Sequence, residues 1–275
     1  METLIAETVL PNGMKIFCLR EDEVLTLYEQ IQDYFKNGIE LHEGDTVLDV
    51  GANIGLFTLW SYQQCHKNVT VYAFEPIPAI FDVLSRNAQR FDPEKLRVFP
   101  CGVWRETKMM KFAYHPNATP LSNAYPQDSQ ELRDQLKEAV LRNLRYAPPY
   151  IRWLRWFPSF LRSFILDIQV KKAFQTEQIT CQMKTISDIV RENDIQQIDL
   201  LKVDVEKSEL DVLLGIEEDD WQKVKQVVVE VHDLEDRVKQ ITALLKAHGL
   251  TEITVEQENL FQGSNLFNLY ALRSS

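Results

Sequence analysis

Residues 46–59 read TVLDVGANIGLFTL, and the other motifs of the chain can be placed relative to this stretch. Thr46–Val50 is a short apolar run with β-branched residues, Gly51 interrupts it, and a second apolar stretch follows. The pattern predicts a strand, a tight turn and a helix. Because glycine has no Cβ and the first amides of a helix lack internal partners, such a turn can bring backbone donors close to a ligand.

The turn lacks the dinucleotide-binding fingerprint. That fingerprint needs glycine at its first, third and sixth positions, which here hold Gly51, Asn53 and Leu56. Two of the three positions fail, so a nicotinamide enzyme is disfavoured. Asparagine adopts the left-handed conformation more readily than most residues, so the turn can still form at position 53. The motif is D-x-G-x-N-x-G, and its residues are candidate cofactor contacts: Asp49, Gly51, Asn53 and Gly55.

An acidic residue follows the next predicted strand. Val69–Phe74 is strand-like and leads into Glu75 and Pro76. An acid about 20 residues beyond the glycine turn is placed to hold the two hydroxyls of a ribose. The turn and the acid together describe an adenosine-type pocket without a pyrophosphate-binding loop, and S-adenosylmethionine fits that description. Glu75 and Pro76 are therefore candidate cofactor contacts.

Three further predicted strands should end at the same rim. They are Leu96–Val103, the nearly continuous apolar run Ile198–Val203, and Val224–Val231. In an open α/β sheet, ligands bind at the carboxyl ends of the strands. We expect this rim to carry Asp49, Gly51, Glu75, Cys101, Gly102, Asp204, Glu206, Glu230 and His232. Of these, Cys101 and Gly102 should lie over the adenine edge.

The turn, with DLLKVDVEKSELDVLLG at 199–215 and VVVEVHD at 227–233, resembles the FkbM family of S-adenosylmethionine-dependent methyltransferases. The resemblance runs from about Asn12 to the C-terminus, except for one insert. Where the family usually reads D-V-E-G-x-E, this chain has DVEKSE at 204–209. The resemblance implies an α/β, Rossmann-like class I methyltransferase fold, with a seven-stranded, mostly parallel sheet and one antiparallel edge strand. It also implies S-adenosylmethionine as the cofactor.

We expect a single domain, since a chain of 275 residues can bury one sizeable α/β core. The turn signal Pro11–Gly13 predicts a hairpin, and Asp22–Asn37 has the spacing of a helix that would cover the cofactor. The expected parts are an N-terminal hairpin and cap helix at 1–45, a cofactor-binding half at 46–115, a helical insert at 116–177, and the second half of the sheet at 178–275.

Composition excludes several classes of protein. The net charge of −11 argues against nucleic acid as the main partner, since binding to phosphates needs a basic face. The four cysteines form no C-x-x-C pair, which indicates reduced thiols rather than a zinc site or a disulfide framework. The chain has no run of 18 apolar residues and no signal peptide, so we expect a cytoplasmic protein that is not held in a membrane.

The insert is aromatic and basic. Between 131 and 175 it has nine basic and four acidic residues, within an acidic chain. One interpretation is a lid that forms the acceptor pocket. A second is a docking face for an acidic carrier protein or an anionic membrane. A third is extra helices that pack on the core. The candidate acceptor contacts are Trp153, Trp156 and Phe160 in the insert and Tyr28 and Tyr34 in the cap helix, although both tyrosines could instead be core residues.

His232 is the candidate general base, because a histidine can take a hydroxyl proton near neutral pH. Glu206 or Glu230 could orient its ring and stabilise the imidazolium. Alternatively, His232 is only hydrogen-bonded at a strand end. Asp204 could cap a helix, contact substrate or bind the methionine amino group. These four residues could also gather a divalent cation, but a sulfonium methyl group is already activated, so no metal is expected.

These observations predict an S-adenosylmethionine-dependent O-methyltransferase. The expected acceptor is a hydroxyl of a hydrophobic or carrier-bound natural-product intermediate, presented as a small molecule, a peptide or a carrier-bound group. The alternatives are a carboxylate or sugar-hydroxyl acceptor, or a non-catalytic module that keeps the cofactor fold and docks an acidic partner through residues 116–177.

Overall fold

The computed structural model describes residues 5–116, 137–138, 140–141, 144–145, 152–173, 175–257 and 262–274. Much of the insert expected at 116–177 therefore lies outside the described residues. The side chain of Phe160, a predicted acceptor contact, lies outside them too.

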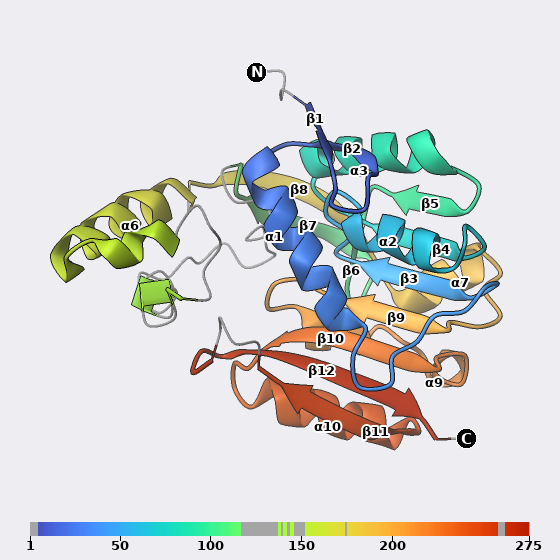
Figure 1. Ribbon diagram of the computed structural model, residues 1–275. Helices are drawn as coiled ribbons and strands as arrows, with labels where there is room; N and C mark the ends of the chain where they lie inside the picture. The colour runs from blue at the N-terminus through green and yellow to red at the C-terminus, as the bar shows by residue number, and fades with distance from the viewer. Residues whose placement is uncertain are drawn as a thin grey trace.

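The N-terminal part is the predicted hairpin and helix. Strands β1 (Ala6–Val9) and β2 (Lys15–Cys18) pair antiparallel in a sheet of their own. Helix α1 (Glu21–Ile31) follows and continues into the 3-10 turn η1 (Gln32–Tyr34). Figure 1 shows α1 crossing in front of the sheet. This position places the end of α1 and η1 over the carboxyl ends of the central strands.

The central sheet confirms the predicted fold class. Its strands are β3 (Thr46–Val50), β4 (Thr70–Phe74), β5 (Leu96–Phe99), β9 (Leu200–Val203), β10 (Gln226–His232), β11 (Leu250–Glu256) and β12 (Leu266–Arg273), in the order β11-β12-β10-β9-β3-β4-β5. The strands from β10 to β5 pair in parallel. The one antiparallel strand, β12, is inserted between β10 and the outermost strand β11. The chain leaves β3 for β4 on one side and returns as β9 on the other, so the switch point that favours ligand binding lies at β3.

Helices cover both faces of this sheet because its strands are apolar on both sides. One face packs against α1, α2 (Leu56–Gln64) and α3 (Pro78–Phe91), and the other against α7 (Ile186–Glu192), α8 (Glu209–Leu213), α9 (Glu218–Trp221) and α10 (Arg237–Ala247). In β4, Val71 and Ala73 face the first group, whereas Tyr72 and Phe74 face the second. Successive residues of each strand thus point to opposite faces of the sheet, and this alternation decides which helix layer each side chain contacts.

A separate three-stranded sheet differs from the prediction. The expected strand Leu96–Val103 is split, because β5 ends at Phe99 and Pro100, which has no N–H to donate, follows it. The remainder forms β6 (Gly102–Val103), which joins β7 (Lys108–Tyr114) and β8 (Glu177–Lys184) in the order β6-β8-β7.

The described part of the insert stands apart from the sheet. It comprises the 3-10 turn η3 (Trp153–Trp156) and helix α6 (Ser159–Ala173). Figure 1 shows α6 projecting away from the central sheet. Leu154 and Leu166 pack with Leu144 in a small core of their own. Among the described residues, no helix is long and apolar enough to cross a membrane.

Candidate active site

A cavity of about 640 Å³ opens at the carboxyl ends of β3, β4, β9 and β10. Gly51 directly follows β3 with φ +77°, a conformation that suits glycine. A Cβ at Gly51 would overlap the carbonyl oxygen of Asp204, so no other residue allows β3 and β9 to approach this closely. Asn53 has φ +50°, as the sequence predicts.

The backbone donors of this turn are used within the protein, contrary to the expectation that they face a ligand. The amides of Gly51 and Ala52 donate to the carbonyl oxygen of Phe74 at 3.2 and 3.0 Å. The amide of Asn53 donates to Glu75 Oε2 at 3.2 Å. The physical reason is that β3 and β4 remain paired up to the turn. The first two amides of the turn therefore continue the hydrogen bonding between these strands. Recognition of a ligand is therefore left to side chains such as Glu75.

Glu75 is a buried carboxyl group on the wall of the cavity. Its Oε1 accepts a hydrogen bond from the amide of Ile77 at 2.9 Å. Burial raises the pKa of Glu75 to about 7, although these amide hydrogen bonds and the charge of Lys202 oppose the rise. Near neutral pH this carboxyl group therefore exchanges between its neutral and ionised forms. In its ionised form it can accept hydrogen bonds from a diol.

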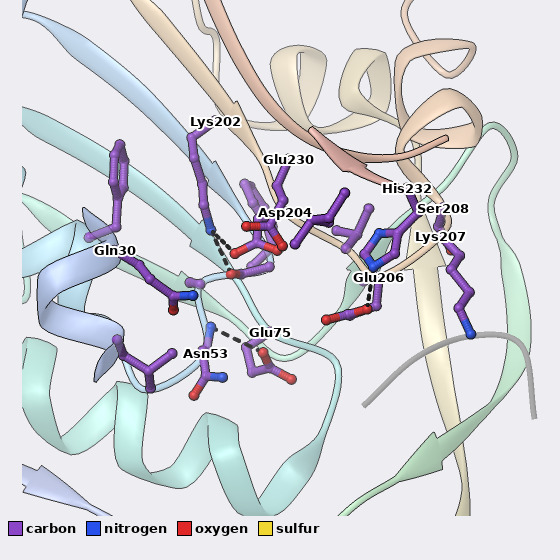
Figure 2. A pocket seen from close by; sticks show the side chains of 18 of the residues that line it. Gln30, Asn53, Glu75, Lys202, Asp204, Glu206, Lys207, Ser208, Glu230 and His232 are labelled. Atoms are coloured by element: carbon purple, nitrogen blue, oxygen red, sulfur yellow. Dashed lines mark hydrogen bonds and ion pairs between the residues drawn. The ribbon is translucent and has the colours of Figure 1, made fainter. Parts of the chain in front are cut away.

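Lys202, in the middle of β9, ties the ends of two strands together. It is 3% exposed, and its Nζ donates to the carbonyl oxygen of Gly51 at 2.8 Å. The same nitrogen lies 3.1 Å from Asp49 Oδ1 and 3.5 Å from Asp204 Oδ2. Burial alone would lower the pKa of Lys202, but the charges of Asp49 and Asp204 raise it. The ammonium group is thus charged, and Figure 2 shows the Lys202 side chain extending toward Asp204.

His232, at the end of β10, lies between two carboxylates. Its Nε2 is 3.1 Å from Glu206 Oε2, and its Nδ1 is 2.9 Å from Glu209 Oε1. Burial lowers the pKa of His232, but Glu206 and Glu209 outweigh burial and raise it well above 6.5. At neutral pH the ring is therefore an imidazolium that donates from both nitrogens.

Glu209 is the orienting carboxylate that sequence reasoning missed. It is fully buried at the start of α8, and its Oε2 is 3.1 Å from Nη1 of Arg237. Burial raises the pKa of Glu209, but the hydrogen bond and charge of His232 lower it further than burial raises it. Sequence reasoning expected Glu206 or Glu230 to orient the ring. Glu206 does contact it, and Glu230 lines the same cavity.

The cavity brings together most of the predicted residues. Its lining includes Tyr34, Gly51, Asn53, Glu75, Pro76, Gly102, Asp204, Glu206, Glu230 and His232. Tyr34 donates its hydroxyl hydrogen to Asp204 Oδ2 at 3.0 Å, which joins η1 to β9. In Figure 2, Glu75 and Asn53 lie together in the lower part of the view, and His232 lies apart from them, to the right of Asp204. The site therefore has two ends, which we call the Glu75 end and the His232 end.

Six predicted contacts do not line the cavity. Two belong to the glycine turn: Asp49 is buried behind it, where it accepts a hydrogen bond from Thr58 Oγ1 at 2.6 Å and pairs with Lys202. Gly55 precedes α2 and packs toward Leu84. In these positions both residues shape the turn and do not line the cavity.

The other four are buried or exposed elsewhere. Cys101 and Tyr28 face the two hydrophobic cores, and burial raises the pKa of the Cys101 thiol to about 11. Trp153 and Trp156 are 42% and 77% exposed, because the intervening Leu154 is the residue that η3 buries. Neither tryptophan lines the cavity, so neither supports a lid over it.

Lys202 is the other functional residue that sequence reasoning missed. The available signal was one charged residue inside an otherwise apolar strand, in LLKV at 200–203. Within the described residues, no group of three or more side chains is arranged to hold a metal ion.

Comparisons with known proteins place this chain in a family. A model described as the methyltransferase FkbM domain matches residues 49–251. The 31-O-demethyl-FK506 methyltransferase FkbM of Streptomyces tacrolimicus is 36% identical over an alignment of 275 positions that covers 98% of each chain. The AMB antimetabolite synthetase AmbE of Pseudomonas aeruginosa is 31% identical over 97% of this chain, which spans only 12% of that synthetase.

A solved structure supports the fold. The crystal structure of methyltransferase FkbM from Methylobacillus flagellatus KT aligns with a TM-score of 0.52 at 14% identity, over 89% of this chain and 50% of that one. The family match implies S-adenosylmethionine as the cofactor. The residues present fit such a group, since Glu75 offers a carboxylate to a ribose beside apolar walls at Ile77 and Ile80.

We predict that replacing Lys202 with methionine destabilises the protein by about 3–5 kcal/mol, because Asp49 would remain buried without its partner. Unfolding in urea measures the change. The additional substitution Asp49→Asn should recover part of the loss. The control Lys239→Met, at an exposed site, should change stability by less than about 0.5 kcal/mol. A double variant as unstable as Lys202→Met would contradict the assignment of the pair.

We also predict that affinity for S-adenosylhomocysteine, the demethylated cofactor, rises about tenfold between pH 6 and pH 8. The carboxyl group of Glu75 is mostly neutral below its pKa of about 7 and ionised above it, and only the ionised form accepts both hydroxyl hydrogens of a ribose. Calorimetry at several pH values measures this. The variant Glu75→Gln should bind more weakly and lose the pH dependence; a Gln variant with the wild-type profile would exclude Glu75 as its source.

Proposed function

Because this chain belongs to the FkbM methyltransferase family, we propose that it methylates a hydroxyl oxygen of a hydrophobic or carrier-bound natural-product intermediate. The observation that carries the proposal is the imidazole of His232, held by carboxylates in the same cavity as Glu75. An oxygen acceptor is further supported by the name of the Streptomyces tacrolimicus relative, a 31-O-demethyl-FK506 methyltransferase.

The two ends of the cavity have different tasks in this proposal. S-adenosylmethionine, when bound, supplies an electrophilic methyl group on a sulfonium. Glu75 would hold its ribose, and the carboxylate of Asp204 would bind its amino group. Lys202 and Tyr34 hold Asp204 in place through contacts of 3.5 and 3.0 Å. Most of the rate enhancement then comes from positioning, because the acceptor oxygen must be held in line for attack.

The acceptor hydroxyl must lose its proton, and His232 is our proposed base. The proton goes to Nε2, the nitrogen next to the cavity-lining Glu206, while the fully buried Glu209 keeps a proton on Nδ1. Only the neutral ring can accept a proton, and the two carboxylates make that form scarce at pH 7. Their compensating effect is to stabilise the imidazolium that forms on proton transfer.

The walls of the cavity support a hydrophobic acceptor. Apolar side chains line it from several elements: Leu27, Ile31, Phe57, Val103, Phe112 and Leu266. Such walls bind an apolar ligand by removing its surface from water. A sugar hydroxyl is the less favoured acceptor on this ground. A carboxylate acceptor is the second alternative, and it would need no base.

A carrier-bound acceptor is supported by the described part of the insert. Trp156 and Phe164 are exposed on η3 and α6, and the same two elements carry Arg155 and Arg162. A basic surface with exposed aromatic side chains suits an acidic carrier protein. A non-catalytic docking module would use the same surface but would show no turnover.

The direct test is incubation with methyl-labelled S-adenosylmethionine and candidate alcohols. We expect the rate to rise with pH through an inflection above pH 6.5, because neutral His232 becomes more abundant as pH rises. The variant Glu206→Gln removes one of the carboxylates that raise the pKa of His232, so its inflection should move to lower pH. The variant His232→Ala should be slower by about 10²–10⁴-fold.

Two results would redirect this proposal. A His232→Ala protein with the full rate would remove the base assignment. A flat rate profile between pH 6 and pH 8, measured at saturating S-adenosylmethionine, would favour a carboxylate acceptor. Cofactor binding without any turnover would favour the docking module.

A further inference from the structure

Lys207 and Ser208 lie beside His232, but the proposed proton transfer does not use them. Both residues line the cavity. Figure 2 shows Lys207 extending from the side of His232 that faces away from Asn53 and Glu75. The site therefore continues past the reacting centre, to the place where the remote part of an acceptor would lie.

The backbone at Lys207 would suit glycine better than lysine. Its φ is +71°, in the left-handed region that costs a residue with a Cβ conformational energy. The main chain is fully bonded there, since its amide donates to Glu209 Oε1 at 2.8 Å and its carbonyl accepts from Nη1 of Arg237 at 2.7 Å. The turn itself therefore does not need a side chain at this position. Strained residues that persist in this way are typical of functional sites.

The ammonium group of Lys207 has no ion pair or hydrogen bond within the described residues. The neighbouring cations are already matched: Arg237 is 3.1 Å from Glu209 Oε2, and His232 lies between Glu206 and Glu209. Glu206 and Glu209 are thus occupied by cations other than Lys207. Among the described residues, the charge of Lys207 is therefore left for an added anion to match.

Ser208 supplies a second, independent indication of a ligand. Its side chain is 3% exposed, and its Oγ has no hydrogen-bond partner among the residues that the structure describes. A buried hydroxyl without a partner is unfavourable, and such groups usually bond to protein, water or ligand. Ser208 lines the same cavity next to Lys207, so both residues belong to this end of the site.

We propose that Lys207 Nζ and Ser208 Oγ bind an anionic oxygen group, a carboxylate or a phosphate, at the end of the acceptor remote from its methylated hydroxyl. The term acceptor rests on the proposed function, whereas the binding of an anion does not depend on turnover. A lysine ammonium is a compact charge that accommodates either anion, and the serine hydroxyl adds one directed hydrogen bond. This site would select anionic over neutral acceptors of the same shape.

The test uses simple anions as probes. Wild-type protein saturated with S-adenosylhomocysteine is titrated with malonate, with inorganic phosphate and with neutral malonamide, and binding is followed by calorimetry or by chemical shifts. We expect malonate or phosphate to bind and malonamide not to bind. The anion that binds more tightly identifies the group as a carboxylate or a phosphate.

Matched variants assign the binding to these residues. Lys207→Met keeps the backbone strain but removes the charge, and it should weaken anion binding at least about tenfold. Lys207→Arg should retain most of it. Ser208→Ala should weaken binding severalfold. Lys207→Gly should also lose anion binding, yet it should unfold at the same or a higher urea concentration because the left-handed strain is relieved.

Three results would overturn the proposal: no anion binding by the wild type, unchanged binding in Lys207→Met, or a Lys207→Met protein that loses affinity for S-adenosylhomocysteine instead. The last result would assign Lys207 to the carboxylate of the cofactor. Failure of the proposed function would look different, since methyl transfer would be absent while anion binding and its dependence on Lys207 remained.

Discussion

The site depends on one buried ammonium group. Lys202 reaches the carbonyl oxygen of Gly51 and the carboxylates of Asp49 and Asp204, and its Nζ lies 5.6 Å from the ring of Tyr34. Moving this charge out of water is costly, and only well-placed partners offset the cost. The arrangement therefore tolerates little displacement of β3 relative to β9. It holds Gly51 against the backbone of Asp204 at the switch point, where the chain reverses its direction of sheet growth.

Two buried glutamates with opposite electrostatics divide the cavity. Glu75 receives hydrogen bonds from neutral amides, which do not overcome burial, so its pKa is raised to about 7. Glu209 receives the imidazolium of His232 and the guanidinium of Arg237, which overcome burial, so its pKa is lowered. The Glu75 end can thus change its charge near neutral pH with little cost. The His232 end is a network of fixed charges, and a proton can move there only if the network stays balanced.

The residues at the rim were predictable from the sequence, because each of them directly follows its own apolar run. Apolar runs that end in polar residues place Gly51, Glu75, Asp204 and His232 at the carboxyl ends of parallel strands, and the sheet then brings those ends together. The pairing of residues across the rim was not predictable in this way. Lys202 and Glu209 act through partners on other elements, so their roles follow from the register of β3, β9 and β10 rather than from spacing. Trp153 and Trp156 are exposed and do not line the cavity, and composition does not show which side of a 3-10 turn is buried.

The two ends of the site also differ in how their backbone conformations are obtained. At the Glu75 end, the positive φ angles belong to Gly51 and Asn53, two residue types that adopt them at little cost. At the His232 end they belong to Glu206 and Lys207, for which the left-handed region is unfavourable. The strain at Glu206 places its carboxylate 3.1 Å from Nε2 of His232, so the conformation and the charge network require each other. A glycine at these positions would relieve the strain but would remove the side chains that line this end of the cavity. In the proposed function, selectivity for the acceptor therefore resides in this short, strained turn after β9, whereas the Glu75 end can stay the same for any acceptor.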